Sequence, residues 1–420
     1  MRCPHERDAY PTTPWCPLAK KQTPPAARLS DPQAIDLVTQ LMAIPGRSGE
    51  EGLVAQFIRL KLREAGVPDD AVRQDTANKR SPLGGDIGNL IVKLPGVGPR
   101  RMLSAHLDTV PICVGCKPRR KGPVIVSADP KTGLGGDNRA GCAVLLAAAM
   151  DIARSPLPHP PLTFLWTVQE EAGLHGARNL STGLLGRPRL AFNFDGGSPA
   201  KLTIGATGGY RMTIEVTGLA SHAGNAPQQG VSAIAIASLA IADLTRKGWH
   251  GLVKKGRKQG ASNVGVIHGG EATNVVTDRV TLRAEARSHD AAFLERIVAE
   301  IKQAFDHAVA EVRSESGQTG NVEFRGQLDY AAFRLPANDP SVAAAGGAIR
   351  AVGREPEIAV TNGGLDANWL TARGVPTVTL GCGQRSIHTV SEQLDIAEFL
   401  LARAIAFRLA QGESAAPQAG

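Results

Sequence analysis

The chain has 420 residues, of which 42% are hydrophobic, enough to bury the core of one large domain or of two smaller ones. Its net charge of +8 is moderate, and the basic residues form short clusters without interleaved aromatic residues, so we expect no nucleic-acid partner. No apolar run approaches the roughly 18 residues of a transmembrane helix, and the first 29 residues hold no apolar stretch of signal-peptide length. Together with six cysteines that form no evident disulfide framework, these features predict a cytoplasmic protein without membrane contact.

The chain begins with six prolines among polar residues, a composition that sustains neither a helix nor a central strand. We therefore expect a disordered tail over residues 1–29, and a second one over residues 411–420. Apolar residues then recur at helical spacing over residues 49–65, and short apolar runs alternate with helical segments such as residues 141–154. This alternation is typical of an α/β fold with a mostly parallel sheet and flanking helices. The apolar runs are residues 89–94, 102–105, 162–168, 190–194 and 376–380.

The middle of the chain has a different pattern. Residues 209–218 alternate between polar and apolar as in a half-exposed strand, and the segments after them predict the order βαββαβ. That order is typical of a compact ferredoxin-like unit. We expect this unit, residues 208–333, to interrupt a larger domain formed by residues 30–207 and 334–410.

Charged side chains follow the predicted strands where the strands end. Ligands of open α/β sheets bind beyond the carboxyl ends of the strands. Adjacent glutamates after a buried strand must face a cleft or a cation, because uncompensated buried charge is costly. In chain order these residues are His106 with Asp108, Glu170 with Glu171, Asp195, and His388.

Two of these features are ambiguous when taken alone. Asp108 should point the same way as His106, because strand side chains repeat every two residues, and it can fix the ring of a ligating histidine. A His-x-Asp pair at a strand end is nevertheless more often a local hydrogen bond. Asp137 lies in a glycine-rich segment that matches no nucleotide-binding motif, and an ordinary helix N-cap is a fair alternative for it.

Taken together, the two histidines and three of the carboxylates fit a two-metal site. Asp137 can bridge two ions while each ion takes one histidine and one further carboxylate, which leaves Glu170 free as a base. Nitrogen and oxygen ligands without thiolate favour zinc, so we expect two Zn²⁺ per chain, with Mn²⁺ or Co²⁺ as substitutes. Such a site would activate a water, and Glu170 would pass its proton to a leaving amine. The predicted reaction is amide hydrolysis.

The ordered motifs resemble the co-catalytic zinc exopeptidase family that includes peptidase T, glutamate carboxypeptidase and the aminoacylases. The resemblance implies that His106, Asp137 and Asp195 bind one zinc, that Asp137, Glu171 and His388 bind the other, that Asp108 orients His106, and that Glu170 is the base. The motifs span about residues 30 to 410 and are His106-Leu-Asp108-Thr-Val, Gly136-Asp137-Asn, Glu170-Glu171, Asp195-Gly-Gly, Ser221-His222-Ala-Gly and His388-Thr.

The segments Gly363-Gly364-Leu365-Asp366-Ala367 and Leu380-Gly-Cys-Gly383 are most similar to the peptidase T-like branch. That resemblance implies that the βαββαβ unit is a lid and dimerisation domain, whose His222 helps to hold the oxyanion. The expected partners are a short peptide and a second copy of the chain, in a homodimer formed through the lid. Residues implied to bind substrate are Arg287, which can take a carboxylate, and Asn274, Gly364 and Asp366.

Three functions remain open from the residues alone. The leading one is a peptidase T-like aminopeptidase that acts on short peptides, in the manner of a tripeptidase. The second is a related amidohydrolase, such as a carboxypeptidase, dipeptidase or N-acyl amino acid deacetylase. The third is a homologue without metals that binds peptides, because function resides in sites and not in folds. Cys113 and Cys116 are not a family ligand pair, and we expect them in a loop, reduced.

Overall fold

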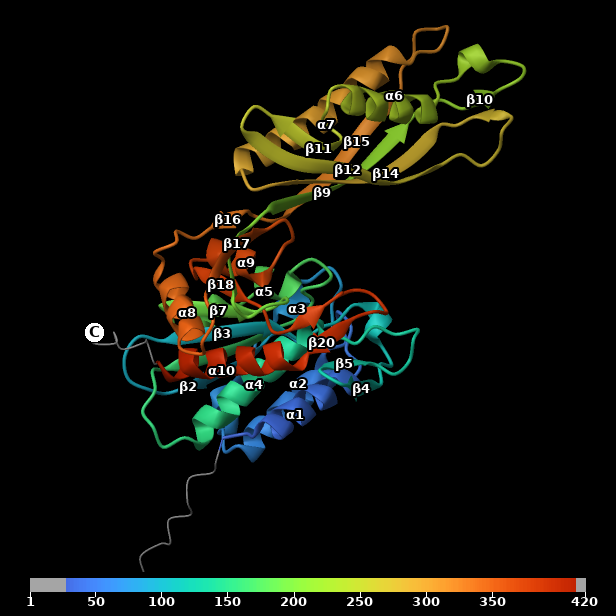
Figure 1. Cartoon of the computed structure of the whole chain (residues 1–420). Coiled ribbons are helices and arrows are strands. Elements are labelled where there is room, and N and C mark those ends of the chain that lie inside the picture. The colour runs from blue at the N-terminus through green and yellow to red at the C-terminus, as the bar shows by residue number, and fades with distance from the viewer. Residues whose placement is uncertain (1–27, 413–420) are drawn as a thin grey trace, which may run out of the picture.

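The computed structural model describes residues 28–412. The two predicted tails fall mostly on residues 1–27 and 413–420, which lie outside the described residues. Figure 1 shows two units, a larger one built on a nine-stranded sheet and a smaller one built on a five-stranded sheet. The middle of the chain forms the smaller unit, so the predicted α/β class with an interrupting lid is confirmed. Within residues 28–412, no helix is both long and apolar enough to cross a membrane.

The central strands of the larger sheet are parallel, and antiparallel strands flank them. β3 pairs in parallel with both β6 and β7, and β18 pairs in parallel with β7. The carboxyl ends of these four strands therefore meet at one edge of the sheet. The sheet order is β1-β2-β6-β3-β7-β18-β8-β16, with β17 beside β8. The strands are β1 (Val72–Gln74), β2 (Leu90–Leu94), β3 (Arg101–His106), β6 (Leu162–Thr167), β7 (Leu190–Phe194), β8 (Lys201–Ala206), β16 (Phe333–Arg334), β17 (Glu357–Thr361) and β18 (Thr377–Leu380).

Helices cover both faces of this sheet. Along β3, Leu103 and Ala105 belong to the main hydrophobic core, whereas Met102 points to the other face and belongs to a smaller cluster with Leu370. Burial of a side chain as large as Leu103 or Met102 stabilises the fold by roughly 1.5 to 3 kcal/mol. The main core is completed by α1 (Asp31–Ala43), α2 (Gly52–Glu64), α4 (Gly136–Arg154), α8 (Pro340–Arg350) and α10 (Ile396–Gln411). The other face carries α9 (Asp366–Ala372), with α5 (His175–Arg178) against it and α3 (Ala77–Arg80) against α5.

Helix α4 begins earlier than its apolar pattern predicts. The pattern indicated a start at residue 141, but the helix extends back to Gly136 across non-helical angles at Asp137 and Asn138. Those first residues are polar or glycine, so they add nothing to the apolar periodicity by which a helix is identified in a sequence. The extension places Asp137 at the edge of the sheet where the four strands end.

The smaller unit, which we call the lid, runs from β9 to β15 (residues 208–330). Its two helices lie on one face of an antiparallel sheet and share a hydrophobic core with that sheet. The sheet order is β11-β12-β14-β9-β15. The elements are β9 (Gly208–Thr217), α6 (Ala233–Arg246), β11 (Gly251–Lys255), β12 (Lys258–Gly269), β14 (Arg279–Ser288), α7 (Ala291–Glu311) and β15 (Asn321–Tyr330).

The lid has one strand more than the predicted order βαββαβ. Strand β11 lies at the edge of the sheet, and Val253 is its one fully buried residue, so the strand shows no apolar alternation in the sequence. Two further short strands, β10 (Ser221–His222) and β13 (Val275–Val276), form a ribbon. Figure 1 shows β10 at the end of the lid that lies away from the larger unit.

A small sheet beside the larger one carries the last candidate ligand. Its order is β19-β20-β5-β4, and His388 lies in the loop between β19 and β20. Cys113 and Cys116, which precede β4, are buried and not disulfide-bonded, although Cys113 ends a 3₁₀ turn (Pro111–Cys113) and does not lie in the predicted loop. The strands are β4 (Pro118–Lys121), β5 (Val124–Ser127), β19 (Gln384–Arg385) and β20 (Gln393–Asp395).

Candidate metal centre

The edge where the parallel strands end brings the predicted ligands together. His106 ends β3, Glu171 and Asp195 follow β6 and β7, and Asp137 lies in the first turn of α4. Ligand atoms of His106, Asp137 and Glu171 all lie within 4.8 Å of one another. His388 approaches the same carboxylates from the loop after β19.

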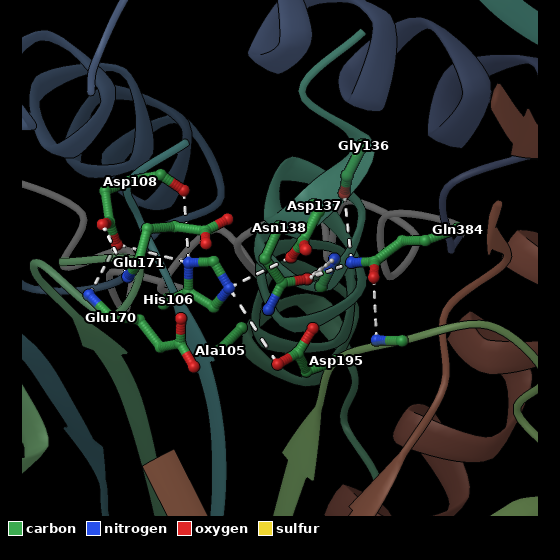
Figure 2. A network of polar contacts seen from close by, with 12 residues as sticks. Ala105, His106, Asp108, Gly136, Asp137, Asn138, Glu170, Glu171, Asp195 and Gln384 are labelled. Carbon is green, nitrogen blue, oxygen red and sulfur yellow. Dashed lines mark hydrogen bonds and ion pairs between the residues drawn. The ribbon is translucent and has the colours of Figure 1, made fainter. Parts of the chain in front are cut away.

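Asp137 lies between the two histidines. Its Oδ1 is 3.2 Å from His106 Nε2, and its Oδ2 is 3.2 Å from His388 Nε2. His388 Nε2 is also 3.0 Å from the Glu171 carboxylate, and His106 Nε2 is 4.0 Å from Asp195 Oδ2. Figure 2 shows His106, Asp137 and Asp195 facing one another. Two sets of one histidine and one carboxylate therefore share Asp137.

These separations suit metal ions. Around a tetrahedral ion with bonds of about 2.0 Å, neighbouring ligand atoms lie about 3.3 Å apart. The donor atoms around Asp137 are already 3.0 to 3.2 Å apart, so an ion would need little rearrangement of that set. The longer gap of 4.0 Å to Asp195 would need to shorten by several tenths of an ångström.

The charges of the site also call for cations. Burial, followed by the charge of Asp137, raises the pKa of Asp195 to about 8, and burial also raises the pKa values of Glu170 and Glu171. Hydrogen bonds to Asp137 and then to Glu171 raise the pKa of His388 to about 10. Carboxylates so close together repel one another, and protons or divalent cations are the two means of compensating them.

Asp108 lies beside His106, on the side of the ring away from Asp137, and contacts three candidate site residues. Its Oδ1 lies 3.3 Å from His106 Nδ1 and accepts from the backbone N–H of Glu170 at 3.0 Å. Its Oδ2 accepts from Ser48 Oγ at 2.6 Å and from the backbone N–H of Glu171 at 3.1 Å. The carboxylate thereby orients the His106 ring and the two glutamates together.

The centre opens into a cleft of about 540 Å³. Glu170, Arg287 and Gly364 line it. Glu285 holds the Arg287 guanidinium through two hydrogen bonds of 3.1 Å. A Cβ at residue 364 would lie 2.7 Å from the Tyr330 ring, so the close approach there requires glycine. The cleft therefore presents a carboxyl group and a cation beside the metal ligands.

Three of the predicted substrate or oxyanion residues lie elsewhere. Asp366 is 1% exposed, and its carboxylate accepts a hydrogen bond from Thr167. His222 and Asn274 are exposed in the lid, where the backbone N–H of Ala223 donates to the Asn274 carbonyl. The residues that line the cleft include neither His222 nor Asn274 among those the structure describes.

Other polar residues at the centre were not predicted. Ser48 bonds to Asp108, and Gln384 and Glu392 bond to the segments around Asp137. Ser48 lies in a loop whose pattern carries no signal. Glu392 follows His388 by four residues, and that proximity to a candidate ligand is the one hint that the sequence offered.

Comparisons with known proteins agree with this geometry. The model of the peptidase family M20/M25/M40 matches residues 102–412. A tripeptidase from Staphylococcus aureus is 28% identical, with a TM-score of 0.82 over 92% of this chain and 99% of that one. The aminopeptidase PepT from Bacillus cereus is 29% identical, with a TM-score of 0.79 over 91% of this chain and 98% of that one.

A third relative is named for carboxypeptidase activity and not for aminopeptidase activity. Carboxypeptidase G2 from Pseudomonas sp. is 28% identical over 271 residues, which cover 62% of this chain and 61% of that protein. The predicted resemblance is thus confirmed, because the family match covers most of the chain and the similar structures span nearly all of it. The chain belongs to peptidase family M20/M25/M40 and is a hydrolase that acts on peptide bonds.

Proposed function

We propose that the protein is a two-zinc aminopeptidase of the peptidase T type that cleaves short peptides, tripeptides among them. The observation that carries this proposal is the placement of the two histidines on opposite oxygens of Asp137, each at 3.2 Å. A carboxylate shared in this way is the arrangement that a bridged pair of ions requires. The similarity to a tripeptidase and to an aminopeptidase along nearly the whole chain supports the choice of substrate.

The ions would be held in two sets. His106, Asp137 and Asp195 would bind one, and Asp137, Glu171 and His388 the other. When bound, two zinc ions supply Lewis acidity that makes a water acidic and polarises the scissile carbonyl. The imidazole ligands His106 and His388 suit Zn²⁺, and Mn²⁺ or Co²⁺ would substitute for it at the carboxylates.

Glu170 would act as the base. It lines the cleft, and Asp108 fixes its backbone through the 3.0 Å hydrogen bond to its N–H. Burial raises the pKa of Glu170, which suits a group that takes a proton from water and then gives it to the leaving amine. Asp108 would keep His106 in the tautomer that directs Nε2 towards the ion.

The substrate would lie along the cleft with its carboxylate on Arg287. The guanidinium faces the cleft and is held by Glu285, so its orientation is set before a peptide arrives. Gly364 would let the peptide backbone pass close to the wall. We assign no direct contact with substrate to Asp366, because it is buried.

We further propose that residues 208–333 serve as the lid and dimerisation domain between catalytic segments 30–207 and 334–410. His222 is exposed and stands apart from its own cleft. A second copy of the chain could present it to the neighbouring active site, where it would donate to the developing oxyanion. Asn274 adjoins His222 and would enter the same partner's cleft.

The second candidate is a related amidohydrolase. The similarity to carboxypeptidase G2 favours a carboxypeptidase within that class, and Arg287 in the cleft would bind a C-terminal carboxylate in that reaction as well. A metal-free peptide binder is the third, and the complete set of ligands together with Glu170 argues against it.

One substrate panel separates the candidates. Zinc-loaded protein is assayed with di-, tri- and tetrapeptides, the same peptides N-acetylated, and N-acetyl amino acids. An aminopeptidase cleaves the free tripeptide and releases its N-terminal residue, and N-acetylation abolishes that cleavage. Release of the C-terminal residue from both forms would overturn the proposal in favour of a carboxypeptidase, and hydrolysis of acetyl amino acids alone would favour a deacetylase.

A further inference from the structure

The hairpin that carries His388 also carries two buried polar side chains. Gln384, at its start, is 4% exposed, and Glu392, near its end, is 2% exposed. Both reach away from the hairpin towards the segments that bear other candidate ligands. Figure 2 shows Gln384 bonded to the segment around Asp137 on one side and to a further backbone nitrogen on the other.

The Gln384 side chain joins two ligand segments through one amide. Its Nε2 donates to the Gly136 carbonyl at 3.2 Å and to Asn138 Oδ1 at 2.9 Å, and these two residues flank Asp137. Its Oε1 accepts from the backbone N–H of Gly196 at 2.9 Å, directly after Asp195. The donor end of the amide therefore holds the Asp137 segment while the acceptor end holds the Asp195 segment.

Glu392 bonds to the Asp137 segment and to the Cys113 thiol. Its carboxylate accepts from the backbone N–H groups of Leu134 at 2.9 Å, Gly135 at 2.7 Å and Asp137 at 2.9 Å. The N–H groups of Gly135 and Asp137 are among the donors that a helix start leaves without partners inside the helix. Glu392 makes no bond to the segment around Asp195 within residues 28–412, so it is a natural comparison for Gln384.

We propose that Gln384 is a positioning residue that sets the separation of Asp137 and Asp195, and through it the affinity of the ion that these two carboxylates share with His106. The inference rests on the proposed two-metal function. Ligand atoms must be held within about 0.5 Å of their productive positions, and the gap of 4.0 Å from His106 Nε2 to Asp195 is longer than the 3.2 Å from His106 Nε2 to Asp137. Loss of a group that orients metal ligands typically costs about 10 to 100-fold in metal affinity.

The test measures each ion separately. His388→Ala leaves the His106, Asp137 and Asp195 set, and His106→Ala leaves the set of Asp137, Glu171 and His388. Gln384→Met, which keeps the size of the side chain but removes its donor and acceptor, is added to each background, and Zn²⁺ affinity is measured by calorimetry on the metal-free proteins. We expect a loss of about 10 to 100-fold in the His388→Ala background and a clearly smaller loss in the other, because Gln384 contacts the shared Asp137 segment in both but the Asp195 segment matters only in the first.

Two controls define specificity. Gln393→Met makes the same change on the same hairpin, where the Gln393 side chain has no hydrogen bond to the described part of the chain, and it should leave both affinities unchanged. Glu392→Gln should weaken the ion in both backgrounds, because both ions share Asp137. Should Gln384→Met not fold, Gln384→Asn, whose amide is too short to span both segments, takes its place under the same criterion.

An equal loss in the two backgrounds, or no loss in either, overturns the role of Gln384. Both results leave the two-metal function intact, because the background proteins still bind zinc. If His388→Ala and His106→Ala proteins each fail to bind Zn²⁺, and the parent chain binds none either, the two-metal function and the role of Gln384 fall together. The parent chain binding two ions without cleaving any peptide would contradict only the proposed substrate.

Discussion

Two adjacent glutamates have different surroundings at the metal centre. The Glu171 carboxylate lies 3.0 Å from His388 Nε2, whereas Glu170 lines the cleft and bonds to Asp108 through its backbone alone. Both residues lie in the turn after β6, beyond Gln169 with its φ of 55°, and their backbone N–H groups are held by the two oxygens of Asp108. Neighbours in the sequence can therefore serve as ligand and base.

Glu170→Gln should keep both ions and lose turnover. The change removes the proton acceptor but no proposed ligand, and general-base catalysis contributes roughly 10² to 10⁴-fold. Metal content and kcat on a tripeptide are measured together. Glu171→Gln is the matched control one residue away, and it should lower metal content. Full turnover by Glu170→Gln would remove the residue from the mechanism.

Asp108→Asn should weaken zinc binding by about 10 to 100-fold, because the buried carboxylate that fixes His106 and both glutamate backbones loses its charge and part of its accepting capacity. Calorimetric titration of the metal-free protein gives the affinity. Ser48→Ala removes one donor to Asp108 and should have a smaller effect. Equal zinc affinity in Asp108→Asn and the parent chain would reduce Asp108 to an ordinary strand-end residue.

At the scale of elements, the lid separates His222 from the centre it was predicted to serve. The ribbon of β10 and β13 lies at the far end of the lid in Figure 1, and His222 Nδ1 accepts from the backbone N–H groups of Gly224 and Asn225 at 3.1 Å. These bonds leave Nε2 available as a donor pointing away from the turn. A two-fold dimer is the simplest way to bring that donor to a metal centre.

Mixed dimers test this arrangement. Glu170→Ala and His222→Ala chains, each inactive alone, are mixed equally under conditions that permit subunit exchange. Half of the dimers are then mixed and each holds one complete site of two, so about a quarter of the parent activity should return. No recovery after verified exchange would refute the action across subunits, and high activity of His222→Ala alone would refute any role in holding the oxyanion.

At the scale of the whole molecule, the metal centre is a cluster of buried carboxylates beside a hydrophobic core. In the metal-free fold the pKa of Asp195 is about 8, above its ordinary 3.8, and that of His388 is about 10, above its ordinary 6.5. Raised values mean that the protonated forms stabilise the metal-free fold at low pH. This stabilisation falls for Asp195 as pH rises to about 8, and for His388 as it rises to about 10.

Removal of the metal ions should therefore lower the Tm more at high pH than at low pH. Ions displace the protons of Asp195 and His388, so they bind more tightly as the pH rises, and at about 100 times the dissociation constant each ion stabilises the fold by about 2.7 kcal/mol. The difference in Tm between zinc-loaded and chelated protein should widen from about pH 6 to about pH 8. Asp137→Ala, which lacks the shared ligand, should show little difference at any pH. A gap that narrows over this range would contradict the charge argument.

The sequence alone determined the α/β class, the inserted lid and the family, since apolar runs, strand ends and ordered motifs are local features that need no knowledge of distant contacts. It also singled out His106, Asp137 and Glu171, whose ligand atoms the fold gathers within 4.8 Å. Their roles as ligands stay predictions. Strand β11 was missed because an edge strand with one buried residue has no periodic signal.

Tertiary structure alone decided the rest. The order β6-β3-β7-β18 places four strand ends side by side, and that order depends on contacts between residues far apart in the chain. The same is true of Gln384, which bonds to segments about 190 and 250 residues away, and of Asp366, which the fold buries beneath the cleft. The position of His222 is set by how the lid stands on the larger unit. No local sequence pattern predicts these contacts, because each one forms between residues that are far apart in the chain and meet only when the protein folds.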